Sequence, residues 1–152
     1  MHNARGLEPP PTLESTGFEL VSHPSSLLQA SSSVENFLNE EYDKEVYYQE
    51  MKDLIQKATG CQLVFIFDHT LRSTSGTTSL NSTDGKSQAQ PVLRVHSDYT
   101  EAGAPRRFRQ LAESFGMTED EVNHIIANRR FAFINIWRSI DTHHPVLQRP
   151  LA

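Results

Sequence analysis

His96 and Asp98 are the residues of this chain best placed to do chemistry, because a single serine separates them in the phrase Val95-His96-Ser97-Asp98. On a β-strand, side chains two positions apart project to the same face, so an imidazole and a carboxylate would stand side by side. Such a pair supplies two ligands of the two-histidine, one-carboxylate site of non-haem Fe(II) oxygenases, which leaves three metal positions open. The competing interpretation is a histidine that hydrogen-bonds a neighbouring carboxylate at a strand end.

Five further residues could belong to the same site. Tyr99 and Thr100 follow the pair directly and could hydrogen-bond the metal ligands. His69 could reach the pocket from the end of an earlier strand, or could make an ordinary strand-end hydrogen bond. Asn135 and Trp137 share one face of a later strand by their spacing. They predict either a pocket wall with an amide pointing inward or a core stripe with one hydrogen-bonded asparagine.

Other candidate residues favour structural or solvent-exposed roles. His143 and His144 lie in a proline-containing stretch, where we expect solvated loop histidines. Arg138 could reach an anionic group, although a surface arginine is the simpler interpretation. Cys61 is the single cysteine, so an internal disulfide is excluded, and its place at the start of an apolar run favours a small buried residue over a nucleophile.

Hydrophobic periodicity predicts the elements that would hold these residues. Helices are expected over residues 34–58, 104–115 and 118–128, and strands over residues 62–67, 92–98 and 131–137. Gly60 stands where a helix should stop. Thr118 followed by Glu121 has the spacing of a capping box. Residues 1–33, rich in proline and serine, predict an extended N-terminal arm, and the polar residues 73–90 predict a flexible, lid-like loop.

Composition narrows the class of protein. The 152 residues are 37% hydrophobic and carry a net charge of −5, with no broad basic surface of the kind that nucleic acids require. No apolar run reaches the length of a membrane span, and the first residues do not resemble a secretory signal. We therefore expect a cytoplasmic protein that binds neither nucleic acid nor membrane.

Several phrases of the chain, in their order and spacing, resemble one family. They are Arg5-Gly6-Leu7-Glu8, Gly17-Phe18, His23-Pro24-Ser25, Tyr47-Tyr48, Phe67-Asp68-His69-Thr70 with Arg72, Val95 to Thr100, Ala104-Pro105-Arg106-Arg107, Asn135 to Arg138, and Pro150-Leu151-Ala152. Together they resemble the asaB-type hydroxylase/desaturase family. That family includes gibberellin-desaturase-like proteins and relatives of the small cephamycin C-7 methoxylase chain, many of them in fungal secondary-metabolite biosynthesis.

The resemblance implies a fold, a set of cofactors and a reaction class. The fold would be α+β, a partial jelly roll (a cupin-like double-stranded β-helix) with the arm and flanking helices, in which residues 34–152 form the N-terminal part of an oxygenase-like domain. His96 and Asp98 match the family's first histidine and its carboxylate. Fe(II) with 2-oxoglutarate would serve a dioxygenase that hydroxylates or desaturates a small-molecule metabolite.

The chain departs from the family pattern at its end. In the family, the second metal histidine and the arginine that pairs with 2-oxoglutarate both lie downstream of the Pro150-Leu151-Ala152 phrase. A jelly roll also uses about eight strands, and only three or four are predicted here. We therefore expect a truncated member of uncertain activity, whose exposed sheet edges would favour association and poor solubility.

Two other functions stay open at this point. One is a non-catalytic accessory or remnant protein that binds a partner or ligand without turnover. The other is a hydrolytic zinc site that uses His96 and Asp98, which would also need a third ligand.

Overall fold

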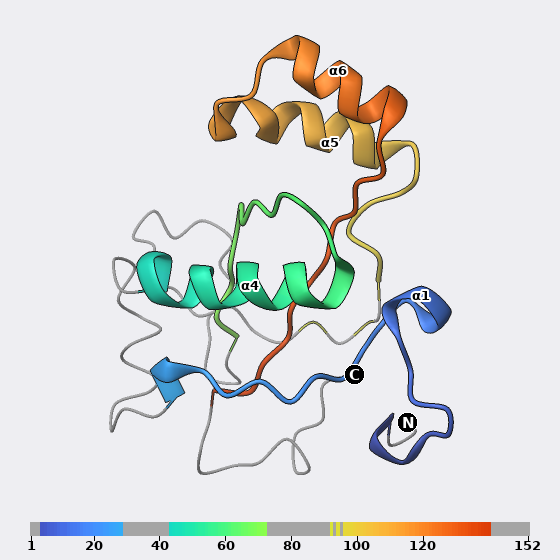
Figure 1. Cartoon of the computed structure of the whole chain (residues 1–152), viewed down its shortest axis with the longest axis vertical. Coiled ribbons are helices and arrows are strands. Elements are labelled where there is room, and N and C mark those ends of the chain that lie inside the picture. The colour runs from blue at the N-terminus through green and yellow to red at the C-terminus, as the bar shows by residue number, and fades with distance from the viewer. Residues whose placement is uncertain (1–3, 29–42, 73–91, 93, 95, 141–152) are drawn as a thin grey trace. The chain divides into compact units, whose positions relative to one another are not determined.

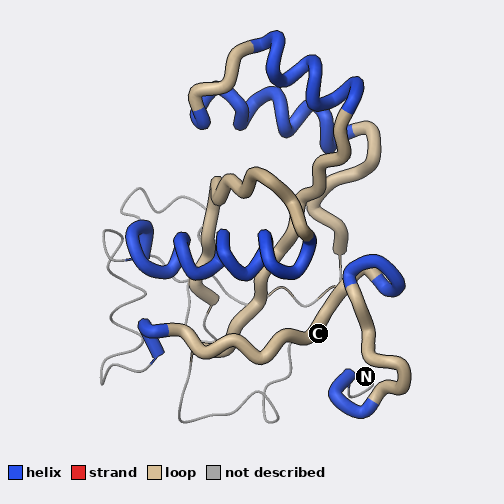
Figure 2. Tube along the Cα trace, viewed as in Figure 1, coloured by secondary structure: helices blue, strands red, loops and turns tan. Residues whose placement is uncertain are grey.

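The computed structural model describes residues 4–28, 43–72, 92, 94 and 96–140, and these fall into two compact units (Figure 1). One unit comprises Met1–Ile66 with Ser139–Ala152, and the other comprises Phe67–Arg138. Within the described ranges the regular elements are helical, and no strand is assigned (Figure 2). The expected arm boundary at residue 33 and the lid-like loop at 73–90 lie outside the described residues.

Helix α4 is the main element of the first unit. A π-helical turn, η3 (Asp43–Tyr47), continues into α4 (Tyr48–Thr59). The helix ends at Gly60, which has a left-handed φ of 69° and donates its backbone N–H to the carbonyl oxygen of Gln56 at 2.8 Å. A residue without a Cβ adopts this conformation at no steric cost. The stop predicted at this glycine is confirmed, while residues 34–42 of the predicted helix lie outside the described residues.

The N-terminal arm is less extended than its prolines predict. It contains three short helical turns, η1 (Ala4–Gly6), α1 (Leu13–Thr16) and η2 (Ser26–Leu28). The turn α1 begins at Thr12, whose Oγ1 accepts a hydrogen bond from the backbone N–H of Ser15 at 3.1 Å. This side-chain cap satisfies a donor that an extended chain would leave to water.

Glu50 of α4 holds the arm at η2. Its Oε2 accepts a hydrogen bond from Ser25 Oγ at 2.6 Å. Its Oε1 accepts two more, from the Ser26 backbone N–H at 2.9 Å and from Ser26 Oγ at 2.6 Å. Beside this contact Leu27 and Met51 are buried, with 1% and 3% of their surfaces exposed. The phrase containing Ser25 thus has a structural role, as the anchor of the arm on α4.

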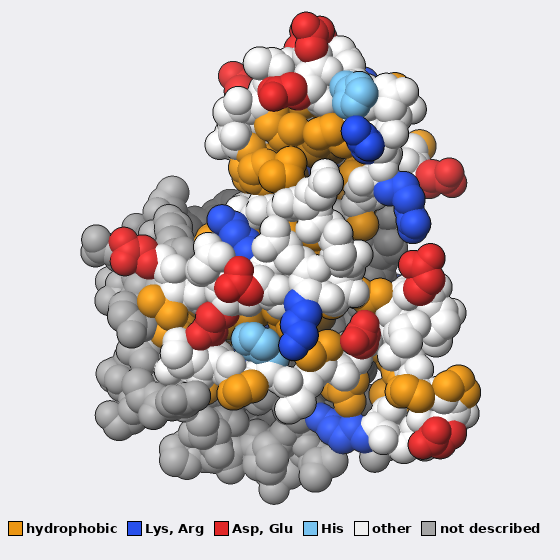
Figure 3. Space-filling view, in the orientation of Figure 1, with side chains coloured by type: hydrophobic (Ala, Val, Ile, Leu, Met, Phe, Trp, Pro, Cys, Tyr) orange, Lys and Arg blue, Asp and Glu red, His pale blue; other side chains and the backbone are white. Residues whose placement is uncertain are grey.

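The second unit contains a pair of helices. Helix α5 (Gly103–Ala112) continues through a 3-10 turn, η4 (Glu113–Phe115), and is followed by α6 (Glu119–Asn128). The two helices lie side by side (Figure 1), and hydrophobic side chains gather on the visible face of the pair (Figure 3). Ala112 and Val122 are buried, one on each helix. Both helices predicted in this part of the chain are confirmed, and their ends differ from the prediction by one to a few residues.

The predicted capping box at the start of α6 is also present. Thr118 Oγ1 accepts from the Glu121 backbone N–H at 3.3 Å, and Glu121 Oε2 accepts from the Thr118 backbone N–H at 2.8 Å. Thr118 Oγ1 also donates to Glu121 Oε2 at 2.8 Å, and the backbone and side-chain donors of Thr118 together hold the pKa of Glu121 below its ordinary value. Each partner therefore satisfies a backbone donor of the other at the helix end.

Replacing Thr118 with alanine should destabilise the second unit by about 1 kcal/mol, the usual cost of losing such a cap. Thermal or urea unfolding monitored by circular dichroism will measure the change. Thr118→Ser retains the capping oxygen and should behave like the wild type. An alanine variant with unchanged stability would contradict this role for the cap.

The three predicted strands are loops in the part of the chain that is described. Several of their side chains are well exposed, including Leu63 at 66% and Ile134 and Ile136 at 38% each. Strand propensity expresses packing against neighbouring strands, so an apolar run alone does not secure a strand. The partial jelly roll stays a prediction.

Candidate metal-binding pair

The pair His96–Asp98 lies in an irregular segment that leads into α5. Thr100 lies in the turn before that helix, where its carbonyl oxygen accepts from the backbone N–H groups of Gly103 at 3.0 Å and Ala104 at 2.9 Å. Thr100 Oγ1 accepts from the Gly103 N–H as well, at 3.0 Å. The described contacts of Thr100 thus belong to the helix start, and they place the pair immediately before a rigid element.

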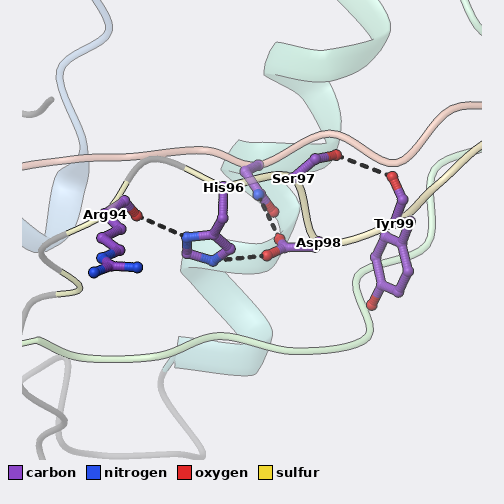
Figure 4. A network of polar contacts seen from close by, with 6 residues as sticks. Arg94, His96, Ser97, Asp98 and Tyr99 are labelled. Atoms are coloured by element: carbon purple, nitrogen blue, oxygen red, sulfur yellow. Dashed lines mark hydrogen bonds and ion pairs between the residues drawn. The ribbon is translucent and has the colours of Figure 1, made fainter.

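The imidazole of His96 and the carboxylate of Asp98 face each other (Figure 4). His96 Nε2 lies 3.2 Å from Asp98 Oδ1, and the side chains are 52% and 43% exposed. Two atoms bound at about 2.1 Å to one ion and at right angles are about 3.0 Å apart. The observed separation therefore suits two adjacent ligands of a single metal ion, in a place that solvent can reach.

The other nitrogen of His96 indicates which atom is available as a ligand. Nδ1 lies 3.0 Å from the carbonyl oxygen of Arg94 (Figure 4). In a neutral ring, donation from Nδ1 to this carbonyl leaves the lone pair on Nε2, which faces Asp98. In that tautomer Nε2 is free to bind a metal ion together with Asp98 Oδ1, 3.2 Å away. The alternative is a direct hydrogen bond or ion pair, in which Nε2 carries a proton and donates it to Oδ1.

Asn135 reaches the same carboxylate from a distant part of the sequence. Its Nδ2 donates to Asp98 Oδ2 at 2.8 Å. Asn135 was one of the predicted site residues, and the structure brings it to the pair. The two oxygens of Asp98 thus have different neighbours, the imidazole on one side and the amide on the other.

Aromatic rings occur both in the segment that contains the pair and in the segment that contains Asn135. Tyr99 packs against Phe133, with ring centroids 4.6 Å apart. Phe133 in turn meets Phe67 edge-to-face at 5.8 Å and Phe131 at 6.2 Å. Tyr99 also accepts a hydrogen bond from Ser97 Oγ at its backbone carbonyl, at 2.9 Å. Of the predicted pocket residues, Tyr99 therefore contributes its ring to an apolar cluster beside the site.

Trp137 and His69 are the other predicted site residues in the part of the chain that the structure describes. Trp137 is 58% exposed and lies against Arg72, whose guanidinium carbon is 5.9 Å from the ring centroid. His69 is exposed. Within the described ranges, no group of three or more histidine, cysteine, aspartate or glutamate side chains could hold a metal ion. His143 and His144 lie outside those ranges.

The pair matches two of the three protein ligands of a non-haem Fe(II) site, both in the type of donor atom and in the distance between the atoms. Nitrogen and carboxylate oxygen are donors that iron accepts, and Nε2 and Oδ1 face each other at 3.2 Å. Helices among the described residues are also too short or too polar to cross a membrane.

Known proteins with similar sequences include several named oxidoreductases. Alpha-ketoglutarate-dependent dioxygenase tstK of Talaromyces stipitatus is 30% identical over 93% of this chain and 46% of its own length. Oxidoreductase R1 of a Phoma species is 27% identical over 99% of this chain and 51% of its own. An uncharacterised protein of the dcmA 3' region in Methylophilus leisingeri is 29% identical, over 86% and 66% respectively. No solved structure matches the chain.

These similarities place the chain among oxidoreductase-like proteins. It belongs to the family described as the Oxidoreductase/YMDC permease-like domain, whose model matches residues 1–152. The chain spans 66%, 46% and 40% of the lengths of three curated relatives that it matches.

Proposed function

We propose that the chain carries part of a hydroxylase/desaturase of the asaB type, which uses Fe(II) and 2-oxoglutarate to oxidise a small metabolite. The observation that carries this proposal is the geometry of His96 Nε2 and Asp98 Oδ1, 3.2 Å apart and open to solvent. The name of one relative, tstK, describes an alpha-ketoglutarate-dependent dioxygenase and supports the same cofactors.

In this proposal His96 and Asp98 hold the metal as its first histidine and its carboxylate. In the family that the chain resembles, the second histidine and the 2-oxoglutarate arginine follow the phrase that matches Pro150-Leu151-Ala152, and the fold is a jelly roll. When bound, iron with 2-oxoglutarate and dioxygen supplies the oxidising chemistry that removes hydrogen from an unactivated carbon. The two residues of this chain would hold the metal beside the aromatic cluster of Phe67, Tyr99, Phe131 and Phe133.

An anaerobic Fe(II) titration followed by calorimetry tests the metal assignment. The wild-type chain should bind one ion, and the His96→Ala/Asp98→Ala double variant should lose that binding. The matched control is Asp120→Ala/His124→Ala, which removes the same two residue types from the exposed surface of α6 in the same unit. Its affinity should equal that of the wild type.

Equal binding by the wild type and the His96→Ala/Asp98→Ala variant would contradict the proposal. Binding of iron at the pair without any effect of 2-oxoglutarate on its absorption spectrum, in a chain extended by its downstream sequence, would favour the accessory protein that binds without turnover.

A further inference from the structure

We propose that Asn135 is a positioning residue for the metal site: its amide occupies one oxygen of Asp98 and leaves the other to bind the metal. This inference rests on the proposed function. It assigns a role to a residue that contacts the carboxylate and need not touch the metal.

The two contacts of Asp98 divide its oxygens. Oδ2 accepts from Asn135 Nδ2 at 2.8 Å, while Oδ1 lies 3.2 Å from His96 Nε2 (Figure 4). A carboxylate held at both ends has a fixed rotation about its Cβ–Cγ bond. The oxygen that faces the imidazole is therefore set before a metal arrives, which lowers the entropic cost of binding.

The number of carboxylate oxygens on the metal decides how many positions stay open. Two histidines and one carboxylate oxygen fill three of six octahedral positions and leave three. A carboxylate can also bind through both oxygens, as it often does on larger cations. Binding of Asp98 through both oxygens would remove one open position, so the hydrogen bond at Oδ2 favours the geometry that keeps three.

Asparagine suits this task better than the residues that resemble it. Its amide donates a hydrogen bond without carrying a positive charge that would repel the metal ion. An aspartate at this position would offer a further oxygen ligand and repel Asp98. The segment is also held in place, because Phe133, two residues before Asn135, packs on Tyr99, the residue after Asp98.

Cobalt binding and infrared spectroscopy test the inference with the whole chain. Co(II) serves as an air-stable probe of the site. Difference spectra between metal-loaded and metal-free protein give the splitting of the carboxylate stretching bands, which is wider for one bound oxygen than for two. Loss of these bands in Asp98→Asn assigns them to Asp98.

In Asn135→Leu, which has a similar volume but no donor, Co(II) affinity should fall about tenfold, at the lower end of the usual effect of losing a partner of a metal ligand. The carboxylate splitting should narrow. Asn135→Gln retains an amide donor, so its Co(II) affinity and its carboxylate splitting should equal those of the wild type. Ile136→Ala changes the next residue of the same exposed segment and should leave both unchanged.

The outcomes separate this inference from the proposed function. If the wild type binds Co(II) better than His96→Ala/Asp98→Ala, but Asn135→Leu matches the wild type in affinity and splitting, the role of Asn135 is wrong and the metal site stands. If the wild type binds no better than the double variant, both are wrong. Should the leucine variant fail to give a cooperative melt, Asn135→Ala repeats the test with a smaller side chain that also lacks a donor.

Discussion

Replacing His96 with alanine should weaken Fe(II) binding by about 100-fold or more, equivalent to at least about 2.7 kcal/mol of binding free energy. The same substitution should leave the stability of the protein almost unchanged. His96 is 52% exposed and faces a carboxylate that is 43% exposed, and such a surface ion pair contributes about 0–1 kcal/mol. Calorimetric titration and thermal unfolding of one preparation measure both quantities.

The simple ion pair predicts a different metal affinity. If His96 only pairs with Asp98, the alanine variant should bind metal as the wild type does, with a loss of stability of no more than about 1 kcal/mol. Asp98→Ala provides the reciprocal measurement, since it removes the other member of the pair. A loss of affinity in both single variants, with unchanged melting temperatures, would assign the pair to metal binding.

Local signals in the sequence predicted the helices of this protein well. Gly60 ends α4, and Thr118 with Glu121 begins α6, as their spacing predicts. Each of these features depends on hydrogen bonds between residues three or four positions apart, so the responsible residues can be recognised in a short window. A short stretch of sequence is therefore enough to predict where a helix begins or ends.

In the candidate site, the sequence predicted one feature correctly and another incorrectly. The side-by-side placement of His96 and Asp98 was predicted from the two-residue repeat of a strand, and the two groups do face each other. The described segment reaches this arrangement as a loop with a bend at Asp98, not as an assigned strand. The predicted placement of the two side chains is therefore observed, whereas the strand that was expected to cause it is not assigned in the described segment.

Contacts between distant residues could not be found in this way. Asn135 meets Asp98 across 37 positions, and Ser25 meets Glu50 across 25. Neither pair has a spacing that distinguishes it from any other polar pair, because the path of the chain between them decides the contact. The sequence marked Asn135 and Ser25 as members of family-like phrases, and only the structure gives their partners.

The anchor of the arm gives the second large prediction, Glu50→Ala, which should destabilise the first unit by about 2–3 kcal/mol at neutral pH. The variant removes three hydrogen bonds to a charged acceptor, and such bonds contribute about 1.5–3 kcal/mol each before exposure to solvent reduces their value. It also leaves the hydroxyl of Ser25, which is 1% exposed, without this acceptor. Urea unfolding measures the change, and Glu45→Ala, which removes an exposed glutamate from η3, is the charge-matched control.

Acid should reduce this difference between wild type and Glu50→Ala. Partial burial raises the pKa of Glu50, but hydrogen bonds from Ser25 and Ser26 and the charge of His23 outweigh it and leave the pKa below the ordinary value of 4.5. A carboxyl group whose pKa is lower in the folded state contributes its full stability above the unfolded pKa and loses it as the pH falls through the folded pKa. The stability difference between the two proteins should therefore be constant near neutral pH and become smaller as the pH falls below 4.5. Curves that keep the same separation throughout would show that the carboxylate charge does not hold the arm.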